Sequence, residues 1–366
     1  MYGWDDVPPV HPIFPLRWEG IAQMRLPHID LCVVQTVVAL PGTQQEGTAS
    51  LFEIVFLGTS ASAPSIRRGL SAQVIKHDEH RFLIDCGEGT QRQILQSGLG
   101  FKRLNRILIT HGHLDHILGL AGLLSTFLRW EAIDELEILG GRWALDRIND
   151  LLYGVVLRGA RPPMEVRLTE IKPGIIFEAE DFTVRAFSVM HRGPDCFGFS
   201  FEEKPRRPFL PDKAETLLIP PGPWRRDLVN GDAVTLPDGR RIEPDQVLGS
   251  ERPGTRLVHV GDTGDIDSLR GVCQGIDTLV IEATYLDEEA DMARRFAHLT
   301  ARQAATLALE SGVNHLILTH ISRRYRERDV IAQAREVFLN TTVARDFDVF
   351  QVKRGDMQKI TEPLAE

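Results

Sequence analysis

The segment His111-Gly112-His113-Leu114-Asp115-His116 decides the fold of this 366-residue chain. It follows an apolar, β-rich stretch, Ile107–Thr110, and precedes a run that predicts a helix over Leu118–Arg129. Four side chains of the kinds that bind zinc and its first-row neighbours thus stand within six residues at a strand-to-helix turn. Because four residues this close cannot all reach one ion, the segment predicts two metal ions a few ångströms apart.

Two ions need further ligands, and three later residues follow predicted strands. His191 comes after the strand Phe182–Val189, Asp262 after Arg256–Val260, and His320 after Leu316–Thr319. A single histidine at a strand end is more often a local hydrogen-bonding residue than a ligand. The order His, Asp, His after three strands favours ligands, and a bridging carboxylate at Asp262 would offset the repulsion between two cations.

The rest of the chain alternates between strand and helix patterns. Strands are predicted early in the chain and again between predicted helices further on. The early strands are Phe52–Leu57, Ala72–Lys76, Arg81–Asp85 and Arg106–Thr110, and the later elements include the strands Thr278–Ile281 and His315–Thr319 and the helices Gly89–Ser97, Thr300–Ser311 and Glu327–Leu339. Early hairpins followed by strand–helix units predict a layered α/β architecture.

Composition describes an ordinary globular protein, with 43% hydrophobic and 25% charged residues. No apolar run approaches the roughly 18 residues that a membrane span needs. The four cysteines lie far apart without a C-x-x-C pair, which argues against a disulfide framework and predicts a reduced, cytoplasmic setting. Residues 1–50 are interpreted as an N-terminal extension of unknown role before a hydrolase domain over 51–366, and Met1–Pro15 lacks the pattern of a signal peptide.

A basic, proline-rich segment interrupts the later part of the chain. Lys204–Arg226 holds six Lys or Arg and two acidic residues, although the whole chain has a formal net charge of −9. Because proline lacks the N–H donor, the clusters at 202–208 and 219–223 cannot form a central strand or a long helix. We interpret the segment, at about 203–226, as a projecting basic arm; the alternative is an ordinary surface loop.

These motifs together resemble the metallo-β-lactamase superfamily, and in detail its ribonuclease Z (tRNase Z) branch. The resemblance rests on Phe56–Ala61, Asp85–Gln91, the His111–His116 cluster, His191-Arg192 followed by Phe197-Gly198-Phe199, Asp262, Glu282-Ala283-Thr284, His298-x-Thr300, Thr319-His320 and Ile219–Pro223. It runs from about Phe52 to Val352. It implies a four-layer αββα sandwich with a projecting arm.

The resemblance also implies a role for each matching residue. His111, His113 and His191 would hold one Zn²⁺, Asp115, His116 and His320 a second, with Asp262 bridging; Mn²⁺ or another divalent metal is the alternative. Asp115 would accept a proton, and Glu282 and His298 would form a proton relay in which His298 protonates the leaving 3′ oxygen. Asp85 would orient a ligand, or else cap the turn after its strand. Substrate contacts would come from Lys204, Arg206, Arg207, Gly222, Pro223, Arg225 and Arg226 in the arm and from Arg68 in a loop near the first strand.

The predicted function is removal of the 3′ trailer from precursor tRNA by two-metal phosphodiester hydrolysis, without attachment to a membrane. The resemblance further implies a homodimer. The fold alone would not justify this, because one fold hosts many reactions. The first alternative is a phosphodiesterase of the same fold that acts on small or cyclic phosphodiesters. The second is a non-catalytic, metal-stabilised binding protein, against which the complete ligand set argues.

Overall fold

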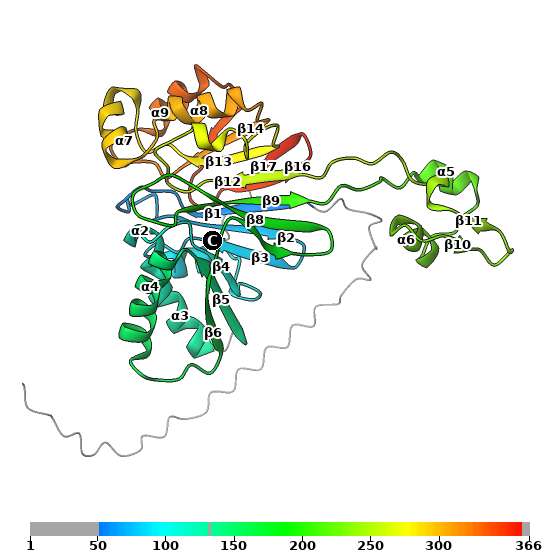
Figure 1. Ribbon diagram of the computed structural model, residues 1–366, viewed down its shortest axis with the longest axis horizontal. Coiled ribbons are helices and arrows are strands. Elements are labelled where there is room, and N and C mark those ends of the chain that lie inside the picture. The colour runs from blue at the N-terminus through cyan, green and yellow to red at the C-terminus, as the bar shows by residue number, and fades with distance from the viewer. Residues whose placement is uncertain (1–50, 131–132, 361–366) are drawn as a thin grey trace, which may run out of the picture. The chain divides into compact units, whose positions relative to one another are not determined.

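A computed structural model describes residues 51–130 and 133–360 of the chain (Figure 1). The predicted extension, residues 1–50, lies outside the described residues. Within them the chain folds into two mixed β-sheets with helices on both outer faces, which confirms the layered α/β sandwich.

The first sheet has eight strands among the described residues. Hairpins form one half of it, and parallel strands from β3 onward form the other half. In spatial order its strands are β17 (Asp356–Ile360), β16 (Val349–Lys353), β1 (Phe52–Gly58), β2 (Ala72–His77), β3 (His80–Ile84), β4 (Arg106–Leu108), β5 (Glu135–Gly140) and β6 (Glu165–Glu170).

The second sheet has seven strands in the described part of the chain. Four of them run parallel, and β9 joins antiparallel to β12 with Val258 opposite Ser200. In spatial order its strands are β15 (Thr341–Val343), β14 (His315–Thr319), β13 (Thr278–Glu282), β12 (Arg256–His259), β9 (Phe197–Glu203), β8 (Phe182–Ser188) and β7 (Gly174–Glu178).

Helices cover the outer face of each sheet. Those of the first half of the chain are α1 (Thr90–Gln96), α2 (Leu114–Ile117), α3 (Gly119–Trp130), α4 (Arg142–Asn149) and the π-helical η1 (Asp150–Leu157). Those of the second half are η3 (Asp267–Leu269), η4 (Asp287–Glu289), α7 (Ala290–Phe296), α8 (Ala301–Glu310) and α9 (Glu327–Arg335).

Three apolar layers hold these elements together. Leucines and isoleucines of α1, α3 and α4 pack on one sheet, and alanines and leucines of α8 and α9 pack on the other. Between the sheets lies an aromatic layer in which Phe52 and Phe182 meet at 5.9 Å and Phe82 and Phe201 at 5.5 Å between ring centroids. Burial of these rings supplies much of the free energy that fixes the strand ends where the site lies.

The basic segment belongs to a longer excursion than the sequence predicts. The chain leaves the second sheet after Glu203 and returns at Arg256, so the excursion continues past Arg226 to Thr255. It begins as a two-stranded stalk in which the backbone N–H groups of Arg206 and Arg252 each donate to the other's carbonyl.

A small folded unit ends this stalk, apart from the two sheets in Figure 1. It consists of α5 (Pro211–Thr216), α6 (Pro223–Val229), β10 (Val234–Thr235), β11 (Arg241–Ile242) and the short η2 (Pro244–Gln246). These elements enclose an apolar cluster of their own, formed by Ala214, Ile219, Leu228, Val234, Leu236, Ile242 and Val247. We call residues 204–255 the arm.

Candidate metal centre

Strands of both sheets carry the predicted ligands at their carboxyl ends. The His111–His116 segment follows β4 of the first sheet, and Asp262 and His320 follow the parallel strands β12 and β14 of the second. His191 follows β8 in the same sheet. Because parallel strands end at the same edge of a sheet, residues far apart in the sequence converge at one place.

Two close loop contacts fix the turn that carries the motif. The Cys86 N–H donates to the carbonyl of His116, and the Gly119 N–H donates to the carbonyl of Cys86. A Cβ at Gly119 would lie 2.0 Å from the Gly87 carbonyl oxygen, so only glycine permits this approach.

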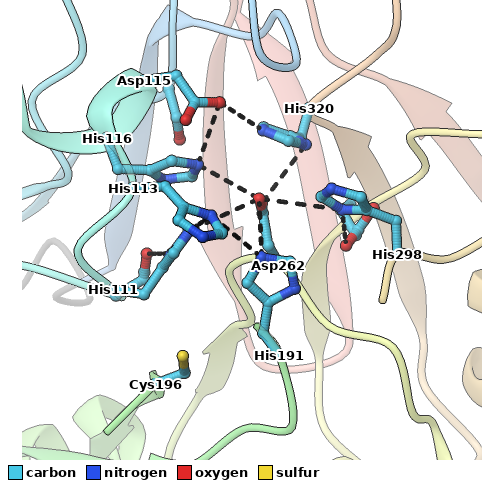
Figure 2. Close-up of polar contacts among 12 residues, drawn as sticks. His111, His113, Asp115, His116, His191, Cys196, Asp262, His298 and His320 are labelled. Carbon is cyan, nitrogen blue, oxygen red and sulfur yellow. Dashed lines mark hydrogen bonds and ion pairs between the residues drawn. The ribbon is translucent and has the colours of Figure 1, made fainter. Parts of the chain in front are cut away.

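The first predicted ligand group is assembled around His113. Its Nδ1 lies 2.9 Å from Nε2 of His111 and 3.3 Å from Nε2 of His191. Oδ2 of Asp262 lies 3.8 Å from the Nε2 atoms of both His111 and His191. Three imidazole nitrogens and one carboxylate oxygen thus face one point, as Figure 2 shows.

The second group shares Asp262 with the first. Nε2 of His116 lies 3.7 Å from Oδ2 of Asp115 and 3.4 Å from Oδ2 of Asp262. Nε2 of His320 lies 3.6 Å from Oδ2 of Asp115. Asp262 stands between the two groups in Figure 2, and its Oδ2 lies within 4 Å of histidines of both groups.

The unsatisfied atoms of the centre fit bound cations. The Nε2 atoms of His116 and His320 are buried and make no hydrogen bond within the described structure. An unpaired buried nitrogen is costly unless another partner satisfies it. Nε2 of His116 faces the carboxylates of Asp115 and Asp262, and Nε2 of His320 faces that of Asp115, so the donor set fits bound cations.

The other nitrogens of these rings are held from outside. Nδ1 of His116 lies 2.7 Å from Oδ2 of Asp85, and Nδ1 of His191 lies 2.7 Å from the Ala297 carbonyl oxygen. Nδ1 of His320 meets the Thr284 hydroxyl at 2.9 Å and also lies 3.4 Å from Oδ1 of Asp262. Such contacts set the tautomer and the orientation of a histidine ligand.

Asp85 is buried in a left-handed backbone conformation, with φ of 58°. Besides His116 it accepts hydrogen bonds from the N–H and the hydroxyl of Thr110, and that hydroxyl lies 3.0 Å from Nδ1 of His111. Its carboxylate therefore touches one ligand directly and a second through Thr110.

A series of hydrogen bonds connects His298 to His320 through Glu282 and Thr284. Nδ1 of His298 lies 2.8 Å from Oε1 of the buried Glu282, which also accepts the Thr263 N–H. The Thr284 hydroxyl donates to the other oxygen of Glu282 and meets Nδ1 of His320. His298 thus lies at one end of a chain that reaches a predicted ligand.

Burial and the charged groups around each side chain set the pKa values in the centre. Burial lowers the pKa of His111 well below its usual value. Burial also opposes the charged form of His298, but the Glu282 carboxylate and its hydrogen bond raise the pKa of His298 to about 9. Burial would raise the pKa of the Asp115 carboxyl, but His116 and His320 lower it.

Known proteins of similar sequence share nearly their whole length with this chain. A ribonuclease Z of Bradyrhizobium sp. (strain ORS 278) is 45% identical over 298 residues, which are 81% of this chain and 99% of the relative. A ribonuclease Z of Haloferax volcanii is 38% identical over 315 residues, which are 85% of this chain and 95% of the relative.

The chain belongs to the ribonuclease Z family. Family models of the superfamily match shorter parts: the anti-Pycsar protein Apyc1 over residues 52–206 and a β-lactamase superfamily domain over residues 231–321. The crystal structure of the short form of human tRNase Z matches with a TM-score of 0.58 and 28% identity, covering 81% of this chain and 98% of that one. The metallo-β-lactamase fold protein YhfI of Bacillus subtilis matches with a TM-score of 0.59 at 15% identity, which supports the fold alone.

The substrate residues expected from this family fall into two groups in the arm. Several are bound to their own surroundings: Nζ of Lys204 to Glu178 at 2.9 Å, Nη1 of Arg207 to Asp245, and Nη2 of Arg225 to the Ile219 carbonyl at 2.8 Å. Arg206 and Arg226 are exposed, and their guanidinium groups make no hydrogen bond to another described residue.

Gly222 and Pro223 form the exposed start of α6, where Gly222 has φ of 119°. Open space surrounds the Gly222 Cα, so the turn leaves its backbone accessible.

Arg68 faces the interior instead of the solvent. Its guanidinium donates to the Thr59 hydroxyl and the Ala344 carbonyl at 2.6 Å each, and to Glu327 at 2.8 Å. A substrate contact by Arg68 would need it to leave all three partners, whereas its neighbour Arg67 is exposed.

Sequence reasoning assigned no role to Thr110, and it quoted Thr284 only as part of a motif. Both touch predicted histidine ligands in the structure. Thr110 directly precedes His111, and Thr284 lies two residues after Glu282. The sequence does not show that their hydroxyl groups point toward the histidines.

Proposed function

We propose that this chain is a metal-dependent endoribonuclease that removes the 3′ trailer from precursor tRNA. The observation that carries the proposal is the seven-residue ligand set around Asp262 with His298 beside it, in a chain that matches ribonuclease Z relatives over nearly their whole length.

The ligands proposed for one ion are His111, His113 and His191, and those for the other Asp115, His116 and His320, with Asp262 shared. Ions held there would supply hydroxide near neutral pH and would stabilise charge on the reacting phosphate. We propose Zn²⁺ because imidazole and carboxylate donors suit it, with Mn²⁺ as the alternative.

His298 is the proposed proton donor to the leaving 3′ oxygen. Its pKa of about 9 keeps the ring protonated at neutral pH. The 2.8 Å contact between Nδ1 and Glu282 holds the ring so that Nε2 carries the transferable proton. An alkoxide leaves poorly unless it is protonated or bound to a metal, so this proton accompanies cleavage of the bond between phosphorus and the 3′ oxygen.

Asp115 is the proposed proton acceptor on the attacking side. His116 and His320 keep its carboxyl ionised, because they lower its pKa. Its Oδ2 also accepts the Ser62 N–H at 3.0 Å, which limits rotation of the carboxylate. The products are a tRNA with a 3′-hydroxyl and a trailer with a 5′-phosphate.

Arg206 and Arg226 are the arm residues best placed to meet tRNA phosphates, because both are exposed and free of internal hydrogen bonds to the described residues. The arm as a whole holds nine Lys or Arg and eight Asp or Glu, a net charge of +1, so binding would depend on where these charges lie. Family membership further supports a homodimer in which the arm of one subunit serves the partner's centre.

A cytoplasmic location is proposed from the cysteines. Cys86, Cys196 and Cys273 are free and buried, as a reducing compartment permits. No helix among the described residues is long and apolar enough to cross a membrane.

The test uses a precursor tRNA that carries a 3′ trailer, with and without a chelator. The proposal expects a single cut at the trailer, a new 3′-hydroxyl, and loss of cleavage on chelation. Cleavage of a nitrophenyl phosphodiester without any affinity for tRNA would instead support the small-substrate phosphodiesterase. A metal-loaded protein that is inert toward both would support a non-catalytic binding protein.

A further inference from the structure

One predicted ligand is held differently from the other four histidines. His111, His116, His191 and His320 each have their outward nitrogen within 3.0 Å of a hydroxyl, carboxylate or carbonyl oxygen. His113 uses Nδ1 toward the centre, and its Nε2 meets no hydrogen-bonding partner among the described residues. No hydrogen bond to another described residue therefore fixes the outer edge of this ring.

Trp143 of α4 lies against this ring. The two ring centroids are 5.7 Å apart, and the planes are nearly perpendicular at 86°. Perpendicular aromatic pairs at this distance attract one another through the opposite charges of a ring's edge and face.

The same indole also closes on two glycines. A Cβ at Gly112, beside His113, would lie 2.9 Å from Cε3 of Trp143. A Cβ at Gly193, two residues after His191, would lie 2.8 Å from Cζ3. Trp143 thus packs against the turns that carry two of the three histidines of the first group.

Arg147, one turn further along α4, contacts both the indole and the Gly112 turn. Its guanidinium lies 5.4 Å from the Trp143 ring centroid, and its Nη1 donates to the Gly112 carbonyl at 2.8 Å. At the start of the helix, Gly141 packs closely against the loop that follows His191. A Cβ at Gly141 would lie 2.4 Å from the Asp195 carbonyl oxygen. The first turns of α4 are therefore fitted to both ligand loops.

We propose that Trp143 is a positioning residue for the first metal ion only: it orients His113 by ring packing and ties the His113 turn to the His191 turn. The inference rests on the proposed two-metal function. In the second group, His116 is held by Asp85, His320 by Thr284 and Asp115 by the Ser62 N–H. The contacts of Trp143 within the described structure reach the first group instead.

The test measures metal affinity rather than turnover. Metal-free protein is titrated with Co²⁺, whose visible absorption reports its ligands, and a chelator competes for each of the two ions. Loss of an outer partner of a ligand weakens metal binding by about 10- to 100-fold. Trp143→Leu should therefore lower the affinity for one Co²⁺ ion by about 10-fold and change the absorption spectrum of that ion alone. The affinity for the other ion should stay unchanged.

Two further variants separate positioning from loss of folding. Trp143→Phe keeps an aromatic ring and should restore most of the affinity. Trp130→Leu makes the same chemical change on α3, where the indole is 58% exposed and packs on Phe101, and it should leave both affinities unchanged.

Equal weakening of both ions by Trp143→Leu would overturn the proposal, as would unchanged affinities or a failure of Trp143→Phe to restore binding. An unmutated protein that binds fewer than two ions would contradict the two-metal function itself. Two ions in the unmutated protein, with no effect of any Trp143 variant, would contradict only the role of Trp143.

Discussion

The metal centre and the arm hold their charged side chains in opposite ways. In the centre, Asp262 is 4% exposed and lies within 4 Å of five imidazoles. In the arm, charges of both signs stand at the surface around a small apolar cluster that the rest of the chain does not share. Chemistry at one phosphorus needs fixed atoms, whereas a surface that meets a long polyanion needs only charge and shape in roughly the right place.

This difference predicts that changes in the centre affect every substrate, while changes in the arm affect only tRNA. The effects should also differ in size. Ligands act on the transition state itself, and arm residues act on binding. Substitutions in the centre and a truncation of the arm test that division.

Asp262→Asn should have the largest effect because it removes the carboxylate that both proposed ions share while keeping its shape. Charge stabilisation by metal ions is worth several kcal/mol, so turnover of both precursor tRNA and a small phosphodiester should fall by more than about 10³-fold. Metal analysis should show loss of at least one ion. Asp265→Asn nearby, which loses only local hydrogen bonds to Asp267 and Ser268, is the control and should retain both ions.

His298→Ala should lower turnover by about 10²- to 10⁴-fold, the range of general acid catalysis, and should leave the metal content unchanged. The experiment is decisive because His298 also lies near Asp262 and His320, within reach of a metal ion. Loss of metal in this variant would make His298 a ligand and would end its proposed role as proton donor.

Glu282→Gln should shift the pH dependence of cleavage more than it lowers the maximal rate. The Glu282 carboxylate stabilises protonated His298, so its removal lowers the pKa of His298 from about 9. His298 then loses its proton at a lower pH. The alkaline limb of the plot of cleavage rate against pH should therefore move to lower pH. An unmoved alkaline limb would show that another group donates the proton.

The arm truncation should affect precursor tRNA alone. Replacing 207–251 by Asn-Gly closes the stalk as a two-residue hairpin between Arg206 and Arg252, whose backbones already pair. KM for precursor tRNA should rise, and each lost phosphate contact should reduce the salt slope of binding by about 0.9. Hydrolysis of the small phosphodiester should persist, and an equal loss on both substrates would mean that the arm supports the centre.

Arg68→Met should have the smallest effect on catalysis. Its three hydrogen bonds lie inside the protein, so the free energy of unfolding should fall by about 1–3 kcal/mol, with KM for precursor tRNA nearly unchanged. Denaturant unfolding of Arg68→Met beside the exposed Arg67→Met provides the measurement. A rise in KM without loss of stability would show that Arg68 contacts the substrate after all.

The sequence predicted the centre better than the arm for a physical reason. Ligands of the His111–His116 segment share one turn, and the others follow apolar strands that are easy to recognise, such as β14. The positions of these strands then bring the ligands together. Local patterns therefore sufficed for the layered α/β architecture and for naming the candidate ligands, whereas the αββα sandwich and the division of the ligands between two ions came from the family resemblance.

Features that depend on the direction of a side chain or on distant pairing could not be predicted. The arm continues to Thr255 because Arg206 pairs with Arg252, and its hairpin strands β10 and β11 have only two residues each. The inward path of Arg68 and the packing of Trp143 on the His113 ring are likewise tertiary facts. No periodic pattern in the sequence predicts these contacts.

We propose that two metal ions, held by the seven ligands, are needed to cleave precursor tRNA. The most direct measurement titrates metal-free protein with Zn²⁺ and follows release of the 3′ trailer. We expect no cleavage without metal and a plateau at two equivalents per chain, with a 3′-hydroxyl on the tRNA. Full activity without metal, a plateau at one equivalent, or no trailer release at any metal concentration would rule out the two-metal reaction.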